Sequence, residues 1–242
     1  MLDQPLTWQS SALSHVGLVR STNEDSYLDA REQGLWVVAD GMGGHSAGDV
    51  ASQTVIENLL DFARRDDLPA NIDNLEDRLF NANGDCRRNS TGKKVMGSTV
   101  AMLFAYDPFC FFMWVGDSRI YRLRKGELTQ VTEDHSLVQE MRALGEITAE
   151  EAAVHPSSNI ITRAIGVRDE LFIDIEYSTV EPGDRFMVCS DGLYKDIRDA
   201  EICELMSTEI PVEKAARNLV DVALERGGSD NITVIVVQAE YV

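Results

Sequence analysis

Four aspartates stand beside apolar runs, and they suggest the chemistry of this chain. Asp40, Asp117 and Asp191 each come at the end of a run of four or more apolar residues, and Asp230 comes just before another run. An Asp-Gly pair alone usually marks only a turn. Here, however, the pattern is repeated beside four sequences typical of buried strands. It therefore predicts carboxylates held rigidly at strand ends, and such poorly solvated charges are energetically costly unless a cation neutralises them.

The ligand type narrows the choice of metal. No cysteine or histidine occurs at a spacing typical of a metal site, so the predicted ligands are oxygens only. Oxygen ligands favour hard ions such as Mg²⁺ or Mn²⁺. These ions keep several waters, which leaves room for a phosphate group and an activated hydroxide. Two such ions about 4 Å apart are the usual arrangement for hydrolysing a phosphate ester.

A polar loop at residues 17–25 carries complementary groups. The guanidinium of Arg20 is suited to gripping phosphate oxygens in bidentate fashion. Glu24 and Asp25 are suited to holding metal-bound waters. Taken alone, this stretch is more typical of a solvated, charged loop.

Length and charge exclude some classes of protein. The 242 residues suit one large domain or two small ones. The net charge of −19 argues against a nucleic-acid backbone or an anionic membrane as the main partner, because both require a basic face. Part of the acidic excess fits carboxylates clustered around cations, and most of it fits a surface that favours solubility.

Cysteine usage and hydropathy predict a cytoplasmic protein. The four cysteines show no C-x-x-C spacing, and Cys110 and Cys189 lie inside apolar runs, so we expect buried free thiols. Residues 1–14 lack a basic segment followed by an apolar core, so we expect no signal peptide. No uncharged apolar stretch approaches about 18 residues, so we expect no membrane span.

Apolar periodicity predicts a chain of mixed strands and helices. Alternating or continuous apolar runs predict strands, and the short turns between several of them make neighbours antiparallel. These strands lie at residues 7–16, 26–29, 35–39, 99–105, 109–115, 120–124, 127–131, 171–180, 185–190 and 232–237. Apolar residues at three- and four-residue spacing predict helices at residues 46–65, 72–89, 200–206 and 211–225.

The arrangement of these elements predicts the fold class. Runs of strands separated from pairs of helices favour α+β, with sheets packed together and helices outside. Residues 133–166 interrupt the strands with short helical patterns, at 136–144 and after a capping box at 148–151. Their weak core character predicts a mobile flap beside a site. We therefore expect one domain over residues 1–242 with a flap at about 133–166, in which 160–165 fits either helix or strand.

Six short motifs follow one another along the chain. They are Gly17-x-x-Arg20-x-x-Asn23-Glu24-Asp25, Asp40-Gly41-Met42-Gly43-Gly44, Gly97-Ser98-Thr99, Val115-Gly116-Asp117-Ser118-Arg119, Ser190-Asp191-Gly192 and Ser229-Asp230-Asn231-Ile232-Thr233. In this order they resemble the motifs of the type 2C (PPM-type) metal-dependent serine/threonine protein phosphatases in their compact bacterial form. The resemblance runs from about residue 17 to residue 237 and is specific because all six motifs keep their order.

The resemblance implies a fold and a metal centre. The fold is a four-layer α-β-β-α sandwich, in which two mainly antiparallel sheets pack together between helix pairs. The centre holds two Mn²⁺ or Mg²⁺ ions, and bacterial members add a third, weaker one. By motif, Asp40 bridges the two ions and the Gly41 carbonyl binds one of them. Asp191 and Asp230 bind the other, and Asp117 forms the third site together with Asp191.

The resemblance also implies an activity. The expected reaction is hydrolysis of phosphoserine and phosphothreonine in proteins, by in-line attack of the metal-bridging hydroxide with no phosphoenzyme intermediate. Arg20 holds the substrate phosphate, while Glu24 and Asp25 act through water. The implied partners are a bacterial serine/threonine kinase and its targets, and we expect a monomer in the cytoplasm.

The chain departs from many eukaryotic relatives at Met42. Those relatives carry a histidine there that is proposed as the general acid, and a thioether cannot donate a proton. Metal-bound water is one alternative donor. His45 and His135 are nearby candidates, although a role at a helix start or in flap packing suits each of them better.

Two other functions fit parts of the sequence. A pseudophosphatase would bind phosphoproteins without turnover, but it would be marked by the loss of a metal aspartate, and none is lost here. A phosphatase of small molecules such as nucleotides would use the same site chemistry. The sequence shows no signature for adenine or ribose binding, so a comparison of phosphopeptides with nucleotides separates these readings.

Overall fold

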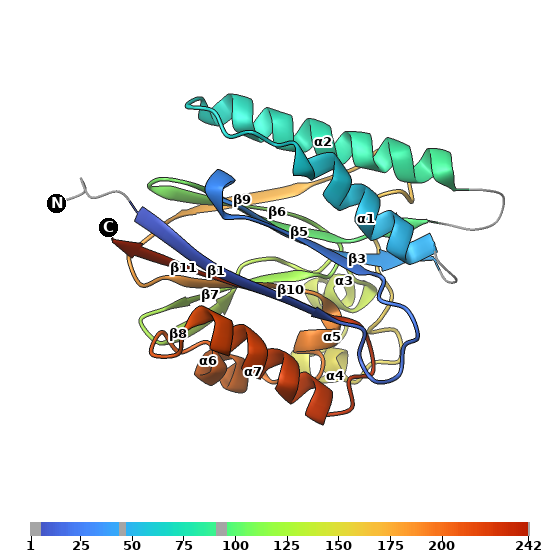
Figure 1. The fold of residues 1–242 in the computed structure, drawn as a ribbon. Helices are drawn as coiled ribbons and strands as arrows, with labels where there is room; N and C mark the ends of the chain where they lie inside the picture. The colour runs from blue at the N-terminus through green and yellow to red at the C-terminus, as the bar shows by residue number, and fades with distance from the viewer. Residues whose placement is uncertain (1–5, 44–46, 91–95, 242) are drawn as a thin grey trace.

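Two antiparallel sheets form the centre of the computed structural model, which describes residues 6–43, 47–90 and 96–241 (Figure 1). The first sheet has five strands in the order β1-β11-β10-β7-β8. Their bounds are Leu6–His15 for β1, Ile232–Tyr241 for β11, Arg185–Cys189 for β10, Arg119–Arg124 for β7 and Glu127–Gln130 for β8.

The second sheet has the order β2-β3-β5-β6-β9, and the short β4 pairs with β3. Its strands are Asp25–Ala30 for β2, Leu35–Met42 for β3, Gly97–Ser98 for β4, Val100–Tyr106 for β5, Phe109–Val115 for β6 and Asp174–Thr179 for β9. All strand pairs in both sheets are antiparallel. For the pairs β5–β6 and β7–β8 this follows from the short turns in the sequence, because such turns can join only antiparallel neighbours.

Helices cover the outer face of each sheet (Figure 1). The pair α1 (Ala47–Leu60) and α2 (Leu68–Asn89) covers the second sheet. The helices α6 (Asp199–Leu205) and α7 (Val212–Glu225), with the single turn α5 (Asp191–Tyr194), cover the first. A 3₁₀ turn, η1 (Arg31–Gln33), joins β2 to β3. No helix in the described part of the chain has the length and apolar character that a membrane crossing requires.

Three apolar layers explain why so many strands are apolar on both faces. In β3, Leu35, Val37 and Ala39 face α1 and α2, while Trp36 and Val38 face the other sheet. Strands β10 and β11 alternate in the same way between the inter-sheet layer and the layer under α7. A strand that is buried on both faces therefore has a continuous run of apolar residues in its sequence. The predicted α+β fold, with packed sheets inside and helices outside, is confirmed.

Element boundaries differ from the sequence predictions at two strand ends and two helix ends. Strand β9 starts at Asp174 and not at residue 171, and β11 continues to Tyr241 and not to residue 237. We expected residues 66–71 to be a polar connection because of Pro69, yet α2 already starts at Leu68. Asp67 caps this helix by accepting a hydrogen bond from the backbone N–H of Ala70, and proline is tolerated in a first turn, where its missing N–H has no partner to lose. Helix α1 ends at Leu60, five residues before the predicted end.

The segment that we expected to form a flap contains α3 (Leu137–Ala143) and α4 (Ala149–Ala153). No described residue of α3 is buried, and the predicted capping box at Thr148 is present. Residues 160–165 form neither helix nor strand and make only isolated bridges, from Ile161 to Ser136 and from Ile165 to Ser98. The first bridge joins the two ends of the segment to each other, and the second joins its end to β4. Its start is fixed to the body by the His135 N–H, which donates to the Gly116 carbonyl at 2.9 Å.

Candidate metal centre

The topology brings the four strand-end aspartates to one end of the sandwich. Strands β3 and β6 are both antiparallel to β5, so Asp40 and Asp117 lie at the same edge of their sheet. In the other sheet β10 is antiparallel to β11, so Asp191 after β10 meets Asp230 before β11. The reversed order of the fourth sequence motif is explained by this antiparallel pairing.

Asp40 lies at the middle of the cluster. Its backbone N–H donates to the Thr99 hydroxyl at 3.1 Å, and its carbonyl accepts from the Thr99 N–H at 2.8 Å. Asp25 is its direct partner across β2 and β3. Burial raises the pKa of Asp40 well above its ordinary value, and the charge of Asp25 raises it further, followed by the charges of the other strand-end aspartates. These carboxylates are crowded closely enough to resist ionising together.

Two buried carboxylates each present an oxygen with no protein partner. Asp25 accepts from the Ser190 hydroxyl at 2.7 Å with Oδ2, while its Oδ1 and the Oδ1 of Asp117 have no hydrogen-bond partner among the described residues. Asp117 is only 2% exposed. Burial raises the pKa of both carboxyl groups to about 7. Buried oxygens without donors are costly, so these two atoms call for a cation or an ordered water.

The other two aspartates pair with basic side chains. Asp191 forms an ion pair with Lys195, four residues along the same turn. Asp230 accepts from Arg20 at 2.7 Å, and the Arg20 side chain is 54% exposed. Both pairs place a positive charge at the edge of the cluster, as expected for carboxylates that need neutralisation.

The donor set fits Mn²⁺ or Mg²⁺. The available atoms are carboxylate and backbone oxygens, which suit hard ions. In the described part of the chain, no three His, Cys, Asp or Glu side chains enclose a single metal position. Ions of this class commonly keep several waters and use one or two carboxylates each, so an open arrangement of paired aspartates is compatible with them.

The loop before β2 is held over the cluster by Asn231. The side-chain oxygen of Asn231 accepts from the Glu24 N–H at 2.8 Å, and its amide donates to the Val16 and Thr22 carbonyls at 2.8 and 3.0 Å. The Glu24 carbonyl in turn accepts from the Gly41 N–H at 3.0 Å. Burial, with the charge of Asp49, raises the pKa of Glu24. Arg20 and Asp25 also lie beside the strand-end aspartates, next to Asp230 and Asp40.

Close backbone approach explains two of the glycines beside the aspartates. A Cβ on Gly41 would lie 1.9 Å from the Gly48 carbonyl oxygen, so β3 and the start of α1 touch there. A Cβ on Gly192 would lie 2.1 Å from the Asn231 carbonyl oxygen and 3.2 Å from the Cβ of Asp230. Only glycine fits such a gap. Gly192 therefore allows Asp191 to approach Asp230.

Several residues that hold the centre together had no individual role in the sequence predictions. Ser190 donates to Asp25 and accepts from the Thr233 N–H at 2.9 Å, which links the two sheets. Thr99 shares a 2.7 Å hydrogen bond with Ser118. Ser118, Ser190 and Asn231 each adjoin an aspartate in a motif, and Thr99 belongs to the motif at residues 97–99. The motifs therefore marked these residues, but their hydrogen-bond partners lie far along the chain.

The structure places only one of the two candidate proton donors, His135, and it lies packed inside the protein. The ring of His135 is 6% exposed, and its Nδ1 accepts from the Gly116 N–H at 3.0 Å. The proton therefore sits on Nε2, which lies 3.2 Å from Asp174. Burial lowers the pKa of His135, and the ring stacks on Trp114. Both nitrogens are engaged inside the protein, as suits flap packing. His45 lies outside the described residues.

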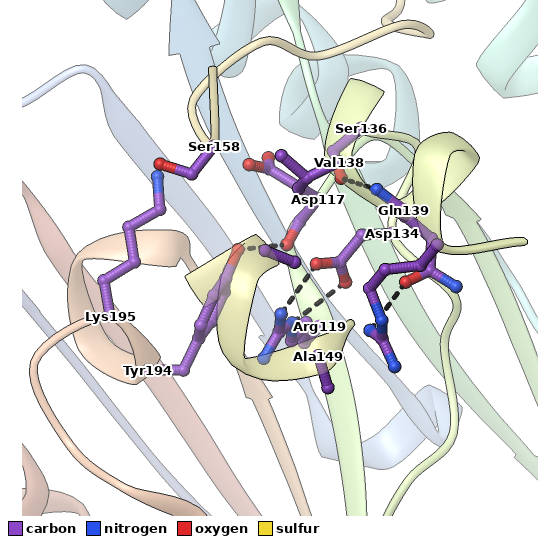
Figure 2. A pocket seen from close by; sticks show the side chains of 12 residues that line it. Asp117, Arg119, Asp134, Ser136, Val138, Gln139, Ala149, Ser158, Tyr194 and Lys195 are labelled. Atoms are coloured by element: carbon purple, nitrogen blue, oxygen red, sulfur yellow. Dashed lines mark hydrogen bonds and ion pairs between the residues drawn. The ribbon is translucent and has the colours of Figure 1, made fainter. Parts of the chain in front are cut away.

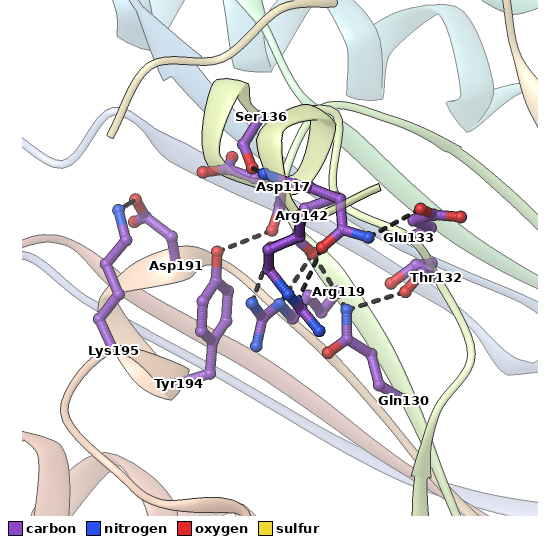
Figure 3. A network of polar contacts seen from close by, with 12 residues as sticks. Asp117, Arg119, Gln130, Thr132, Glu133, Ser136, Arg142, Asp191, Tyr194 and Lys195 are labelled. Carbon is purple, nitrogen blue, oxygen red and sulfur yellow. Dashed lines mark hydrogen bonds and ion pairs between the residues drawn. The ribbon is translucent and has the colours of Figure 1, made fainter. Parts of the chain in front are cut away.

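A cavity of about 380 Å³ opens beside Asp117, between the body and the flap (Figure 2). Arg119 lines this cavity and donates to both carboxylate oxygens of Asp134 at 2.9 and 2.7 Å. The Cζ atom of Arg119 lies 3.7 Å from the centroid of the Tyr194 ring. The Tyr194 hydroxyl donates to the Asp117 carbonyl at 3.0 Å. These contacts join α5, the Asp117 turn and the flap in one polar network (Figure 3).

Comparison with known proteins matches both the fold and the sequence. A family model described as protein phosphatase 2C matches residues 18–228. Protein phosphatase PhpP of Streptococcus pneumoniae is 35% identical over 239 residues, covering 94% of this chain and 96% of the relative. Serine/threonine protein phosphatase PstP of Mycobacterium tuberculosis is 41% identical over 237 residues, covering 96% of this chain and 45% of the longer relative.

A solved structure also resembles this chain closely. The catalytic domain of the serine/threonine protein phosphatase PstP, in complex with two manganese ions, superposes with a TM-score of 0.85 at 36% identity. The superposition covers 98% of this chain and all of the other. The two manganese ions are a property of that structure, and the acidic cluster described above is the corresponding candidate in this chain.

Proposed function

The chain belongs to the protein phosphatase 2C family, and we propose that its acidic cluster is the centre at which phosphoserine and phosphothreonine in proteins are hydrolysed. As a member of this family it is a protein serine/threonine phosphatase. The observation that carries the proposed site is the convergence of Asp40, Asp191 and Asp230 with Arg20 at one end of the sandwich.

Each side chain receives a role in this proposal. Asp40 lies centrally and would bridge two ions, with the Gly41 carbonyl as a further ligand of one. Asp191 and Asp230, brought together at Gly192, would hold the other. When bound, Mn²⁺ or Mg²⁺ would polarise the phosphate and supply a hydroxide nucleophile. The buried Asp25 and the neighbouring Glu24 would orient water next to the ions.

The reaction that we propose is a single in-line displacement at phosphorus. The chain's own contribution is to hold the phosphate with Arg20 and to keep the strand-end aspartates in fixed positions, so that the phosphate is bound in a single orientation. Met42 provides no proton, and His135 is engaged inside the protein, so we propose that water protonates the leaving seryl or threonyl oxygen. Rapid-mixing kinetics should show no burst of released alcohol, because no covalent enzyme intermediate accumulates.

Arg20 is proposed to grip the substrate phosphate. Its guanidinium is half exposed and now pairs with Asp230, so an ion on Asp230 would release it toward the cleft. We expect Arg20→Lys to lower kcat/KM for a phosphopeptide about tenfold, equal to about 1.4 kcal/mol, because a lysine loses the bidentate geometry.

Inhibition by inorganic phosphate provides a second measurement for Arg20. Its inhibition constant should rise by a similar factor in Arg20→Lys, since the same two oxygens are bound. Arg217→Lys, an exposed position on α7, is the matched control and should change neither constant. An unchanged kcat/KM in the Arg20 variant would show that the loop arginine does not touch phosphate.

Substrate choice is proposed to depend on the flap. The cavity beside Asp117 is lined on one side by α3 and α4, so a peptide bound at the centre would pass next to them (Figure 2). We propose that the natural substrates are a serine/threonine kinase and its targets, in a reducing compartment such as the cytoplasm. The four free cysteines support the compartment. A phosphoproteome compared with and without the active protein would identify the targets.

The proposed function is tested with phosphopeptides and nucleotides in parallel. We expect Mn²⁺-dependent release of phosphate from phosphoserine and phosphothreonine peptides, lost on chelation and restored by added Mn²⁺. kcat/KM should favour the peptides over nucleoside phosphates by at least about tenfold. Preference for nucleotides would favour a small-molecule phosphatase, and tight phosphopeptide binding without turnover would favour a pseudophosphatase.

A further inference from the structure

Lys195 places a fixed positive charge at the outer edge of the acidic cluster. It follows α5 directly, so its side chain returns along the turn to form an ion pair with Asp191 (Figure 3). Its ammonium also donates to the side-chain oxygen of Asn159 in the flap at 2.7 Å. Two acceptors from different segments therefore hold the ammonium in place, and the side chain is only 33% exposed.

The Lys195 side chain also lies on the cavity beside Asp117. Lys195 and Asp117 line one cavity, and the residue between Asp191 and Lys195 that completes the turn, Tyr194, donates to the Asp117 carbonyl (Figure 2). Lys195 therefore carries its charge next to Asp191 and on the same cavity wall as Asp117.

The outer position between Asp117 and Asp191 is where relatives of this family are expected to hold a third, weaker ion. We propose that the Lys195 ammonium supplies the positive charge at this outer position, so that this chain binds two divalent ions where a third would otherwise bind. The inference rests on the proposed function, since it assumes that Asp40, Asp191 and Asp230 hold the inner pair.

Charge and ligand supply both support this assignment. An outer ion would have to use Asp191, one of whose oxygens is already occupied by the ammonium. It would also lie close to that ammonium, and like charges in a partly buried site repel strongly. Asp117 gains a positive neighbour without a metal, which reduces the cost of its buried carboxylate. Because Asn159 holds the ammonium from the flap side, Lys195 cannot swing away without losing a second contact.

The number of bound Mn²⁺ ions tests the inference directly. Free Mn²⁺ is measured by its electron paramagnetic resonance signal during titration of the metal-free protein, which gives the stoichiometry without an activity assay. We expect two ions per chain for the wild type and three for Lys195→Met, which keeps the length of the side chain and removes its charge. Lys195→Arg retains the charge and should return the count to two.

Controls separate the local charge from the net charge. Lys214→Met makes the same substitution at an exposed position of α7 and should leave two sites, because it changes only the total charge. Melting curves of all variants without metal establish that each is folded.

The possible results distinguish this inference from the proposed function. Two ions in both the wild type and Lys195→Met, or three in the wild type, would overturn the role of Lys195 and leave the inner centre intact. No bound Mn²⁺ in any variant would overturn the proposed centre and the inference together. A raised KM in Lys195→Met with an unchanged count of two would assign the lysine to substrate binding instead.

Discussion

Replacing Asp40 with asparagine is expected to reduce phosphopeptide turnover by about a thousandfold or more, without unfolding the protein. Asp40 lies at the middle of the cluster, and its loss removes the proposed bridge between two ions, an effect of at least about 4 kcal/mol on the barrier. The backbone contacts of Asp40 to Thr99 do not depend on its carboxylate, so the strand should remain in place.

Thermal stability gives an independent readout of the Asp40 substitution. Mn²⁺ at about 100 times its dissociation constant should stabilise the wild type by about 2.7 kcal/mol, which raises Tm by about 5–10 °C in a chain of this size. Asp40→Asn should lose most of this gain. Without metal, its Tm should equal or exceed that of the wild type, because a crowded, partly buried carboxylate has been removed.

The matched control for Asp40 is Asp221→Asn, an exposed aspartate on α7. It should retain wild-type turnover and the full stabilisation by Mn²⁺. If Asp40→Asn retained both as well, the carboxylate would not be a metal ligand, and the proposed centre would be wrong. If it lost turnover but kept the stabilisation, Asp40 would act on the substrate and not on the ions.

The fold was largely predictable because its central strands are buried on both sides. The continuous apolar runs at Leu35–Ala39 and Phe109–Val115 follow directly from the layers that cover β3 and β6. Helix boundaries were less predictable, as Pro69 shows, because proline is compatible both with a loop and with the first turn of a helix.

The aspartates were predictable, but their supporting contacts were not. A carboxylate at a strand end is a local pattern, whereas the Asn231 side chain reaches Val16, 215 residues earlier in the chain. Likewise, no spacing rule pairs Ser190 with Asp25 across two sheets. Lys195 was missed because α5 is a single turn, too short to give a periodic signal, and a lysine four residues after an aspartate is common on any helix.

Replacing Gly192 with alanine is expected to damage both stability and activity through one methyl group. Its Cβ would lie 2.1 Å from the Asn231 carbonyl oxygen, a backbone atom that cannot rotate away. Relief requires α5 or the start of β11 to move, and Asn231 in turn holds the loop that carries Glu24. We expect a loss of about 2–3 kcal/mol in the free energy of unfolding, or about 5–10 °C in Tm.

The activity of Gly192→Ala should fall by about a hundredfold, since a displacement of about 1 Å at a catalytic group has this effect. Mn²⁺ affinity should fall as well, because Asp191 and Asp230 are moved apart. Measuring kcat/KM and Mn²⁺ affinity well below the lowered Tm ensures that the folded state is being compared.

Gly84→Ala is the matched control, because the same substitution is expected to stabilise the protein at this position. Gly84 lies inside α2, where a Cβ would meet only the mobile end of Arg88 at 3.1 Å, so alanine should stabilise the helix by about 0.5–1 kcal/mol. The contrast isolates the cause, because both glycines have helical backbones and only Gly192 faces a fixed carbonyl. Wild-type stability and turnover in Gly192→Ala would mean that the Asp191 turn can shift freely, and that close approach at this glycine does not set the distance between the two aspartates.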